Sequence, residues 1–217
     1  MAAARGSGAG VVILAAGRSS RLGEPKGLVL VEGTPWILRQ LDAIGGRRVV
    51  VVLGHDRDRY LASVPELAAR AHVVTNPDPE RGPFSSLQVG LAASEPGVST
   101  FVLPVDVPAA GESVWTALEA ALAAGAAVPG RTEAPLEAPS ADISAAIPEH
   151  EGRGGHPVLL GAGLAAEILG LPASSRLDEV LRRPRARARV VRVPVSDPRV
   201  RLNLNTAEDW GKVRVGG

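Results

Sequence analysis

The residues best suited to chemistry form a cationic, glycine-containing loop near the N-terminus. Three cations, Arg18, Arg21 and Lys26, fall within nine positions, directly after an apolar run. Small residues such as Gly17 let backbone N–H groups approach an anion closely, and arginine and lysine donate charged hydrogen bonds to phosphate oxygens. The pattern therefore indicates a phosphate-binding loop. The alternative is a basic surface loop with a glycine hinge.

Two common glycine-rich phosphate motifs do not fit this loop. A Walker A motif has four residues between its glycines and then Lys and Ser or Thr, whereas five residues separate Gly17 from Gly23, and Lys26 is followed by Gly27. The dinucleotide-binding pattern G-x-G-x-x-G is missing after the apolar run, because the glycine repeat at 6–10 precedes it. NAD binding therefore loses its main support.

One carboxylate stands where a parallel sheet usually places its ligands. Asp106 follows a short apolar run and is bracketed by Pro104 and Pro108, which restrict the local backbone. If residues 100–104 form a parallel strand, Asp106 lies at its C-terminal end, opposite the phosphate loop. Oxygen ligands suit Mg²⁺. We therefore expect Asp106 to hold a magnesium ion, with a turn or helix-capping aspartate as the alternative.

Composition excludes several classes of protein. The 217 residues are 45% hydrophobic and 22% charged, as in a soluble globular protein. The 24 basic and 23 acidic side chains leave a net charge of +1, so no global field favours nucleic acid. The absence of cysteine excludes disulfides and thiolate zinc sites. No apolar run has the length of a secretory signal or a membrane helix, so we expect a cytoplasmic protein.

The elements that must position these residues alternate along the chain. Runs typical of buried strands occupy residues 11–15, 49–53, 71–75 and 100–104. Ordered structure resumes at 145–148 and 157–160, and a further strand fits residues 189–193. Helical patterns fit residues 57–69, 84–93, 112–124, 163–169, 174–181 and 206–213, and a further helix capped by Thr34 and ending at Gly45. The alternation predicts a single domain, residues 1–217, with a three-layer, doubly wound α/β fold and a mostly parallel sheet. We interpret the proline-interrupted stretch 126–144 as a surface insertion.

Five motifs together resemble the nucleotidyltransferases of molybdenum cofactor synthesis, in particular the molybdopterin cytidylyltransferase branch. Residues 14–26 meet the pattern L-A-A-G-x-S-x-R-x-G-x-x-K in full. Four later stretches agree in order and rough spacing: 82–91 (GPFSSLQVGL), 104–108 (PVDVP), 152–158 (GRGGHPV) and 203–209 (NLNTAED). The resemblance spans residues 11–210. It implies a Rossmann-like fold of the nucleotide-diphospho-sugar transferase type.

The resemblance also implies a reaction in which a substrate phosphate attacks the α-phosphorus of an NTP and pyrophosphate leaves. Arg21 would then hold the leaving phosphates, Lys26 would bridge the α-phosphate and the attacking oxygen, and Asp106 would complete the catalytic set. The resemblance places the nucleotide against Leu14, Ala15, Ala16, Gly17, Arg18, Ser85 and Ser86, and the acceptor against Gly155 and His156. The alternatives are a solvated Arg18, helix-capping serines and a structural His156.

The second metal position departs from the cytidylyltransferase branch. That branch usually carries D-x-D-T-P-E-D near its end, whereas this chain has Asn203 and Asn205 in place of both acids and Ala207 in place of proline. An amide oxygen coordinates Mg²⁺ without adding charge, so we expect Asp106 and Asn205 to hold the metal with reduced affinity. The guanylyltransferase branch carries N-x-N-T here, which leaves the choice between CTP and GTP open. A turn and helix N-cap is compatible with this role.

An arginine-rich stretch closes the chain. Nine arginines stand against three acids between Arg176 and Arg201. A solvated helix face is the usual explanation of such a run. The alternative is a docking surface for an acidic partner or for the anionic second substrate.

Taken together, the sequence predicts a Mg²⁺-dependent nucleotidyltransferase that transfers CMP to molybdopterin. Two alternatives remain within the class, namely the use of GTP and the use of a sugar or polyol phosphate as acceptor. A third is a non-catalytic protein that binds nucleotide or cofactor for delivery, which the asparagines at 203 and 205 favour. A molybdoenzyme or its chaperone is an expected partner, whereas nucleic acid and membrane are not.

Overall fold

One mixed sheet organises the protein. The computed structural model describes residues 8–18, 23–124, 143–183 and 190–215, and eight strands within these ranges form the sheet. They are β1 (Gly10–Ala15), β4 (Val49–Leu53), β5 (His72–Thr75), β6 (Thr100–Pro104), β7 (Ala145–His150), β8 (Arg153–Gly154), β9 (Val158–Leu160) and β10 (Val190–Pro194). The order is β10-β7-β9-β6-β1-β4-β5, with β8 beside β7. β9 is antiparallel to both its neighbours and β8 to β7, while the other pairs are parallel, which confirms the expected mostly parallel sheet.

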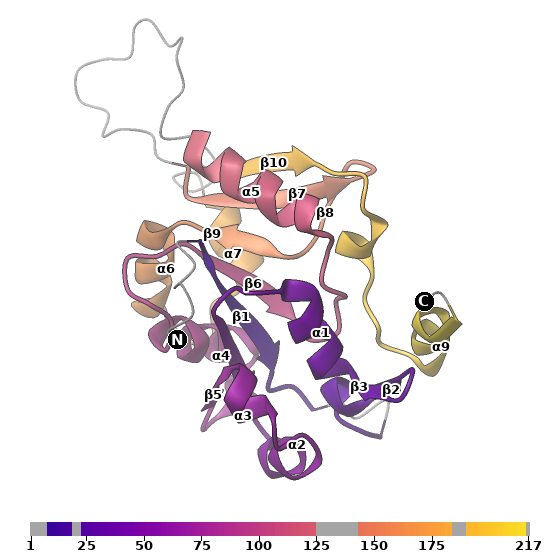
Figure 1. Ribbon diagram of the computed structural model, residues 1–217. Helices are drawn as coiled ribbons and strands as arrows, with labels where there is room; N and C mark the ends of the chain where they lie inside the picture. Colours follow the sequence, from indigo (N-terminus) through magenta and orange to yellow (C-terminus); the bar gives the residue numbers. More distant parts are fainter. Residues whose placement is uncertain (1–7, 19–22, 125–142, 184–189, 216–217) are drawn as a thin grey trace, which may run out of the picture.

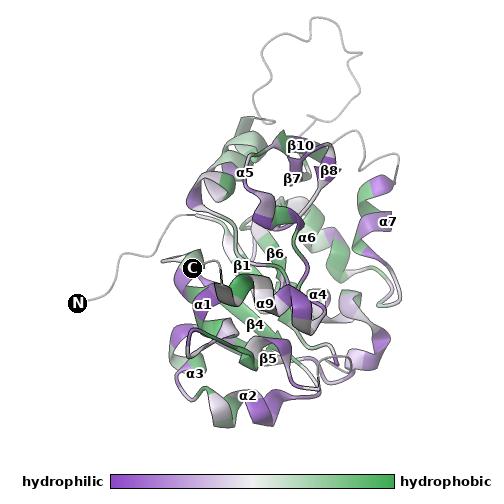
Figure 2. Cartoon of the chain, turned by 90° about the vertical axis from the view of Figure 1, so that its right-hand side faces the viewer, coloured by the Kyte–Doolittle hydropathy of each residue, from purple (hydrophilic) through white to green (hydrophobic). Residues whose placement is uncertain are grey.

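Helices cover both faces of this sheet (Figure 1). The first face packs against α1 (Trp36–Ile44), α2 (Arg57–Ser63), α3 (Leu67–Arg70), α5 (Glu112–Ala124) and α9 (Ala207–Val215). The second face packs against α4 (Pro83–Ala92), α6 (Ala162–Leu169) and α7 (Leu177–Arg182). Alternate residues of β1 contribute to the hydrophobic cores on the two faces, because successive side chains of a strand point in opposite directions. Val11 and Ile13 pack on the first face, and Val12 and Leu14 pack on the second. Figure 2 shows hydrophobic residues concentrated on the central strands.

Three helix predictions were wrong at their boundaries. The predicted helix 174–181 corresponds to α7, which begins only at Leu177. The stretch 57–69 divides into α2 and α3, and Pro65 lies in the break between them. Thr34 does not cap a helix; it belongs to β3 (Thr34–Pro35), which pairs with β2 (Leu30–Val31). Glu32 and Gly33 both have positive φ, which matches the tight hairpin turn between these strands. The first helix therefore begins at Trp36.

Most of the predicted insertion, residues 126–142, lies outside the described residues, and Ile143 and Ser144 lead directly into β7. Within the described ranges, every helix is too short or too polar to cross a membrane.

Candidate active site

Three predicted site residues from distant parts of the chain meet at one point. Lys26 Nζ donates hydrogen bonds to Asp106 Oδ2 at 2.7 Å and to Asn205 Oδ1 at 2.6 Å. Lys26 opens the short 3₁₀ helix η1 (Lys26–Leu28), Asp106 follows β6, and Asn205 precedes α9. The Lys26 and Asp106 side chains are only 18% and 21% exposed. We call Lys26, Asp106 and Asn205 the lysine trio.

Buried side chains of α1 hold the loop that carries Asp106. The Trp36 indole N–H donates to Val105 O at 2.7 Å. The Gln40 amide donates to Val107 O at 2.6 Å and accepts from Ala109 N at 2.7 Å. Gln40 is 1% exposed, so these bonds do not compete with water. The aspartate loop (104–108) therefore has a fixed backbone.

A buried tyrosine supports the lysine. Tyr60 Oη accepts a hydrogen bond from Gly27 N at 3.0 Å, next to Lys26 in the chain. Burial raises the pKa of Tyr60 well above its usual range. A Cβ on residue 27 would stand 2.6 Å from this oxygen, so the close approach requires glycine. The contact fixes the start of η1 and with it the base of the lysine side chain.

Asn205 is held by backbone bonds on both sides. Leu204 N donates to Asp106 O at 2.8 Å, which ties the two loops together. Asp209 Oδ2 accepts from Asn205 N at 3.1 Å and Thr206 N at 2.9 Å, and Asp209 N donates back to Thr206 Oγ1 at 3.2 Å. This reciprocal capping holds the first turn of α9. The predicted N-cap and the predicted ligand position therefore coexist.

The trio offers two oxygen ligands to a metal ion. Asp106 Oδ2 and Asn205 Oδ1 converge on one ammonium group, so the position between them accommodates positive charge. One carboxylate and one amide oxygen suit Mg²⁺, which takes its remaining ligands from water and substrate phosphates. Among the described residues, no group of three or more His, Cys, Asp or Glu side chains gathers around a metal position.

The phosphate loop is described only in part. Arg21 falls in residues 19–22, outside the described ranges, so its role stays a prediction. Ala15 and Ala16 are buried at the end of β1, and Leu14 O accepts from Val105 N at 3.0 Å, while Gly17 and Arg18 are exposed. Arg18 does have partners: its Nη2 lies 2.5 Å from Glu80 Oε1 and its Nε donates to His55 Nε2 at 3.3 Å.

The two serines expected to border the nucleotide face a buried asparagine. Asn76 Nδ2 donates to Ser85 Oγ at 2.9 Å and to Ser86 Oγ at 3.0 Å, and both serines are nearly fully buried. Neither serine caps α4, because its N-cap is Gly82. Sequence reasoning missed Asn76. Its position directly after β5 was the available signal, since loops that follow parallel strands carry site residues.

His156 lies at the boundary between the trio and a large cavity. Its backbone N–H donates to Val200 O at 2.9 Å, and a Cβ on Gly155 would clash with the same carbonyl group. Its ring Nδ1 is buried without a hydrogen-bond partner among the described residues. Burial lowers the pKa of His156, although a bond to Val102 and the charge of Asp106 oppose this effect. The imidazole is therefore neutral at pH 7.

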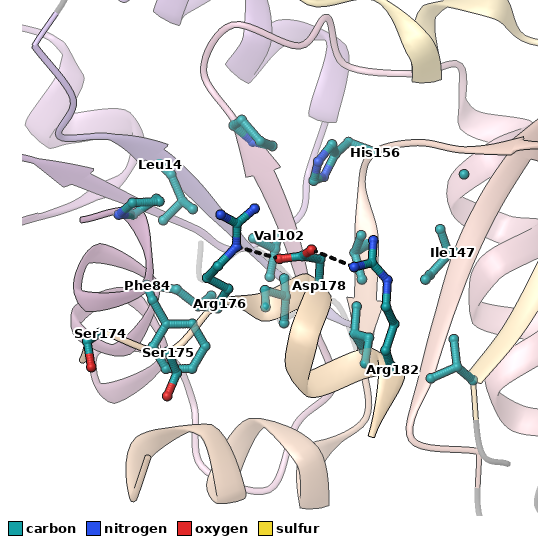
Figure 3. A pocket seen from close by; sticks show the side chains of 18 of the residues that line it. Leu14, Phe84, Val102, Ile147, His156, Ser174, Ser175, Arg176, Asp178 and Arg182 are labelled. Atoms are coloured by element: carbon teal, nitrogen blue, oxygen red, sulfur yellow. Dashed lines mark hydrogen bonds and ion pairs between the residues drawn. The ribbon is translucent and has the colours of Figure 1, made fainter. Parts of the chain in front are cut away.

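The cavity has a volume of about 1000 Å³ and lies over the second face of the sheet, between its strands and α4 and α7 (Figure 3). His156 and Pro104 line it on the side of the trio. Arg81, Arg176, Arg182 and Arg192 also line it, so we call it the arginine pocket. Arg185, Arg187 and Arg189 lie outside the described residues.

Comparison with known proteins shows which family the chain resembles. Residues 11–190 match the family model described as MobA-like NTP transferase domain. A molybdenum cofactor guanylyltransferase of Xanthomonas euvesicatoria is 36% identical over 100 residues, covering 45% of this chain and 46% of that protein. A CMP-5′-(3-aminopropyl)phosphonate synthase of Streptomyces rubellomurinus is 44% identical over 78 residues, covering 31% of this chain and 12% of that protein. The matched stretches thus span less than half the length of these relatives.

Solved structures share the fold. The crystal structure of Rv0371c from Mycobacterium tuberculosis superposes with a TM-score of 0.71 at 22% identity, over 97% of this chain and 100% of that one. A complex of Rv0371c with manganese superposes with a TM-score of 0.67 at 19% identity, over 97% and 100%. The family model covers most of the chain, including Lys26 and Asp106, whereas Asn205 lies beyond the matched residues. The chain belongs to the MobA-like NTP transferase domain family of nucleotidyltransferases.

Proposed function

We propose that this protein transfers CMP from CTP to the terminal phosphate of molybdopterin and releases pyrophosphate. The observation that carries the proposal is the convergence of Lys26, Asp106 and Asn205 on one point. The acceptor phosphate is already an anion, so the reaction needs charge neutralisation and alignment more than covalent help. A positioned ammonium beside two metal-ligand oxygens provides both.

Each member of the trio has a defined task in this reaction. Lys26 would donate to a non-bridging oxygen of the α-phosphate and to the attacking phosphate oxygen, holding the two anions together against their repulsion. Arg21, as the resemblance implies, would bind the departing pyrophosphate. Asp106 and Asn205 would hold Mg²⁺, which supplies Lewis-acid charge to the phosphate when bound. A protein of the same fold crystallised with manganese supports a divalent metal here.

The choice of CTP rests on the motif resemblance to the cytidylyltransferase branch, and a relative that makes a CMP derivative supports it. GTP is the second candidate, because Asn203 and Asn205 match the guanylyltransferase pattern and one relative is a guanylyltransferase. A sugar or polyol phosphate remains an alternative acceptor.

Pyrophosphate release tests the proposal. The purified protein is incubated with each of the four NTPs, with Mg²⁺ or Mn²⁺, and with molybdopterin. Release with CTP supports the proposal. Release with GTP alone would instead support GTP as the nucleotide substrate. Nucleotide binding without release from any NTP would instead establish a non-catalytic binding protein.

A further inference from the structure

The arginine pocket gathers four guanidinium groups in one place. Four arginines line it, Arg81, Arg176, Arg182 and Arg192, and Asp178 is the one carboxylate among its described lining residues. Two further carboxylates pair with these arginines from outside the lining: Glu149 lies 3.0 Å from Arg192, and Glu179 lies 3.6 Å from Arg176. Guanidinium groups that line a pocket favour an anionic occupant, because they offer it charged hydrogen bonds.

The floor of the arginine pocket is apolar. Its side chains come from four strands and one helix and include Leu14, Phe84, Val102, Ile147 and Val158. Burying apolar surface of a ligand against such a floor is favourable. An occupant that fits both surfaces therefore combines an apolar body with anionic groups.

Asp178 forms ion pairs with two of the arginines that line the pocket, Arg176 and Arg182 (Figure 3). Its Oδ1 accepts from Arg176 Nε at 3.1 Å, and its Oδ2 lies 3.1 Å from Arg182 Nη1. The bond from Arg176 lowers the pKa of Asp178, so this carboxylate is ionised at neutral pH. The three side chains are 69%, 42% and 76% exposed for Arg176, Asp178 and Arg182. Exposed ion pairs contribute little because water and salt compete with them, so a ligand anion can replace Asp178 at low cost.

The arginine pocket also adjoins the reacting groups. Pro104 lines the pocket and starts the loop that carries Asp106. His156 also lines the pocket and interacts electrostatically with Asp106. A ligand that reaches from the trio into the pocket therefore presents one end to Lys26 and the other to Arg176 and Arg182.

We propose that the acceptor carries, besides its reacting phosphate, an apolar body and a second anionic group, and that Arg176 and Arg182 bind this second group in place of Asp178. The inference rests on the proposed function, because it takes the reacting phosphate to lie beside Lys26. Asp178 then acts as an internal counter-ion that competes with the second anionic group of the acceptor and is displaced by it.

Two matched phosphomonoesters test the proposal. Phenyl phosphate and 4-carboxyphenyl phosphate share a phosphate and an apolar ring and differ in one remote carboxylate. Their binding to the full chain with CTP and Mg²⁺ is measured by titration calorimetry at low and high salt. We expect 4-carboxyphenyl phosphate to bind about tenfold more tightly at low salt, because charged hydrogen bonds to arginine are strong ones. No preference in the wild type overturns the proposal.

Variants assign the preference to its residues. The double variant Arg176→Gln/Arg182→Gln should bind both esters equally, and Asp178→Asn should strengthen the preference by removing the competing carboxylate. Arg183→Gln is the matched control, since Arg183 is adjacent to Arg182 but does not line the pocket. A preference that survives in the double variant, or that falls in Asp178→Asn, contradicts the proposal.

A separate readout keeps this inference distinct from the proposed function. The affinity of each variant for CTP and its pyrophosphate release with molybdopterin are measured in parallel. If the double variant loses affinity for CTP and keeps the carboxylate preference, the pocket binds the nucleotide and the inference is wrong. If the wild type neither binds CTP nor releases pyrophosphate, the proposed function is wrong, whatever the esters show.

Discussion

The lysine trio and the arginine pocket adjoin each other, yet their side chains are held in different ways. Asp106 sits on a loop whose peptide groups bond to Trp36 and Gln40, both at most 5% exposed. Arg176 and Arg182 are 69% and 76% exposed and bond to Asp178 at the surface. Interactions in the first region are screened from water, whereas those in the second compete with it.

The difference matches the task proposed for each region. Reacting groups must be placed before the substrate arrives, because a misplacement of about 1 Å can cost on the order of 10²-fold in rate. Groups that recognise a remote part of a substrate tolerate adjustment, and their ion pairs can exchange partners at low cost. We therefore expect substitutions around the trio to affect the rate and the stability, and substitutions in the arginine pocket to affect binding alone.

The largest effect is expected from the trio itself. Lys26→Ala and Asp106→Ala should each lower pyrophosphate release about 10²–10³-fold, the loss seen when one charge-stabilising group is removed from an active site. Circular dichroism and thermal unfolding should show that both variants remain folded, since both side chains are partly exposed. A variant that keeps its wild-type rate would exclude that residue from the chemistry.

The next effect concerns the support of the aspartate loop. Gln40→Leu removes the partners of Val107 O and Ala109 N in a buried site, so we expect a loss of about 1–3 kcal/mol in the free energy of unfolding. The turnover number should fall as well, because the loop carries Asp106. Denaturant unfolding and steady-state kinetics measure the two quantities.

A second glutamine provides the control. Gln88 in α4 donates to Ile168 O at 3.0 Å and Leu171 O at 2.7 Å, and thereby joins α4 to the C-terminal end of α6 on the other face of the sheet. Gln88→Leu should also destabilise the protein, yet leave the turnover number unchanged. Equal losses of turnover in both variants would show that general destabilisation, not the position of Asp106, limits the rate.

The sequence predicts the strands of the sheet better than the ends of the helices. Runs such as 49–53 are apolar throughout and become the strand β4, which is buried on both faces. The hairpin at 30–35 was missed, because two-residue strands are too short for a periodic signal and Thr34-Pro35 also fits a helix start. Local preference was ambiguous there, and pairing with β2 decided the outcome.

The candidate site was also predicted only in part. Motif order predicted that Lys26, Asp106 and Asn205 belong together, although 80 and 179 residues separate the lysine from its two partners. No motif indicated Gln40, Tyr60 or Asn76, because each acts through a contact that exists only once helices and strands have packed. The residues proposed to contact substrate follow a pattern in the sequence, while the residues that position them depend on the tertiary structure.

A smaller effect is expected at Asp197, which links the start of α5 to the segment that leads to Asn205. Burial acts to raise the pKa of Asp197, but bonds from Arg199 and from Gly111 N outweigh it, so the pKa is lowered overall. A lowered pKa means that the carboxylate stabilises the fold above its ordinary pKa of about 3.9 and loses this effect as the pH falls through the lower value of the folded state. Asp197→Asn should cost about 1–2 kcal/mol at pH 7. The difference from wild type should shrink below about pH 4 in denaturant unfolding.

The smallest effect on stability is expected at Asp178, which makes a comparison with Asp197 informative. Each aspartate lies two residues from an arginine that it binds, but Asp197 also accepts from Gly111 N at 2.8 Å and from Arg199 N at 3.0 Å. Asp178→Asn should therefore leave the free energy of unfolding unchanged within error, because its side chain is exposed and solvent replaces its ion pairs. A loss as large as that of Asp197→Asn would mean that Asp178 is a structural anchor. The carboxylate would then be too tightly held for an acceptor to displace, and the contrast between the two regions would fail.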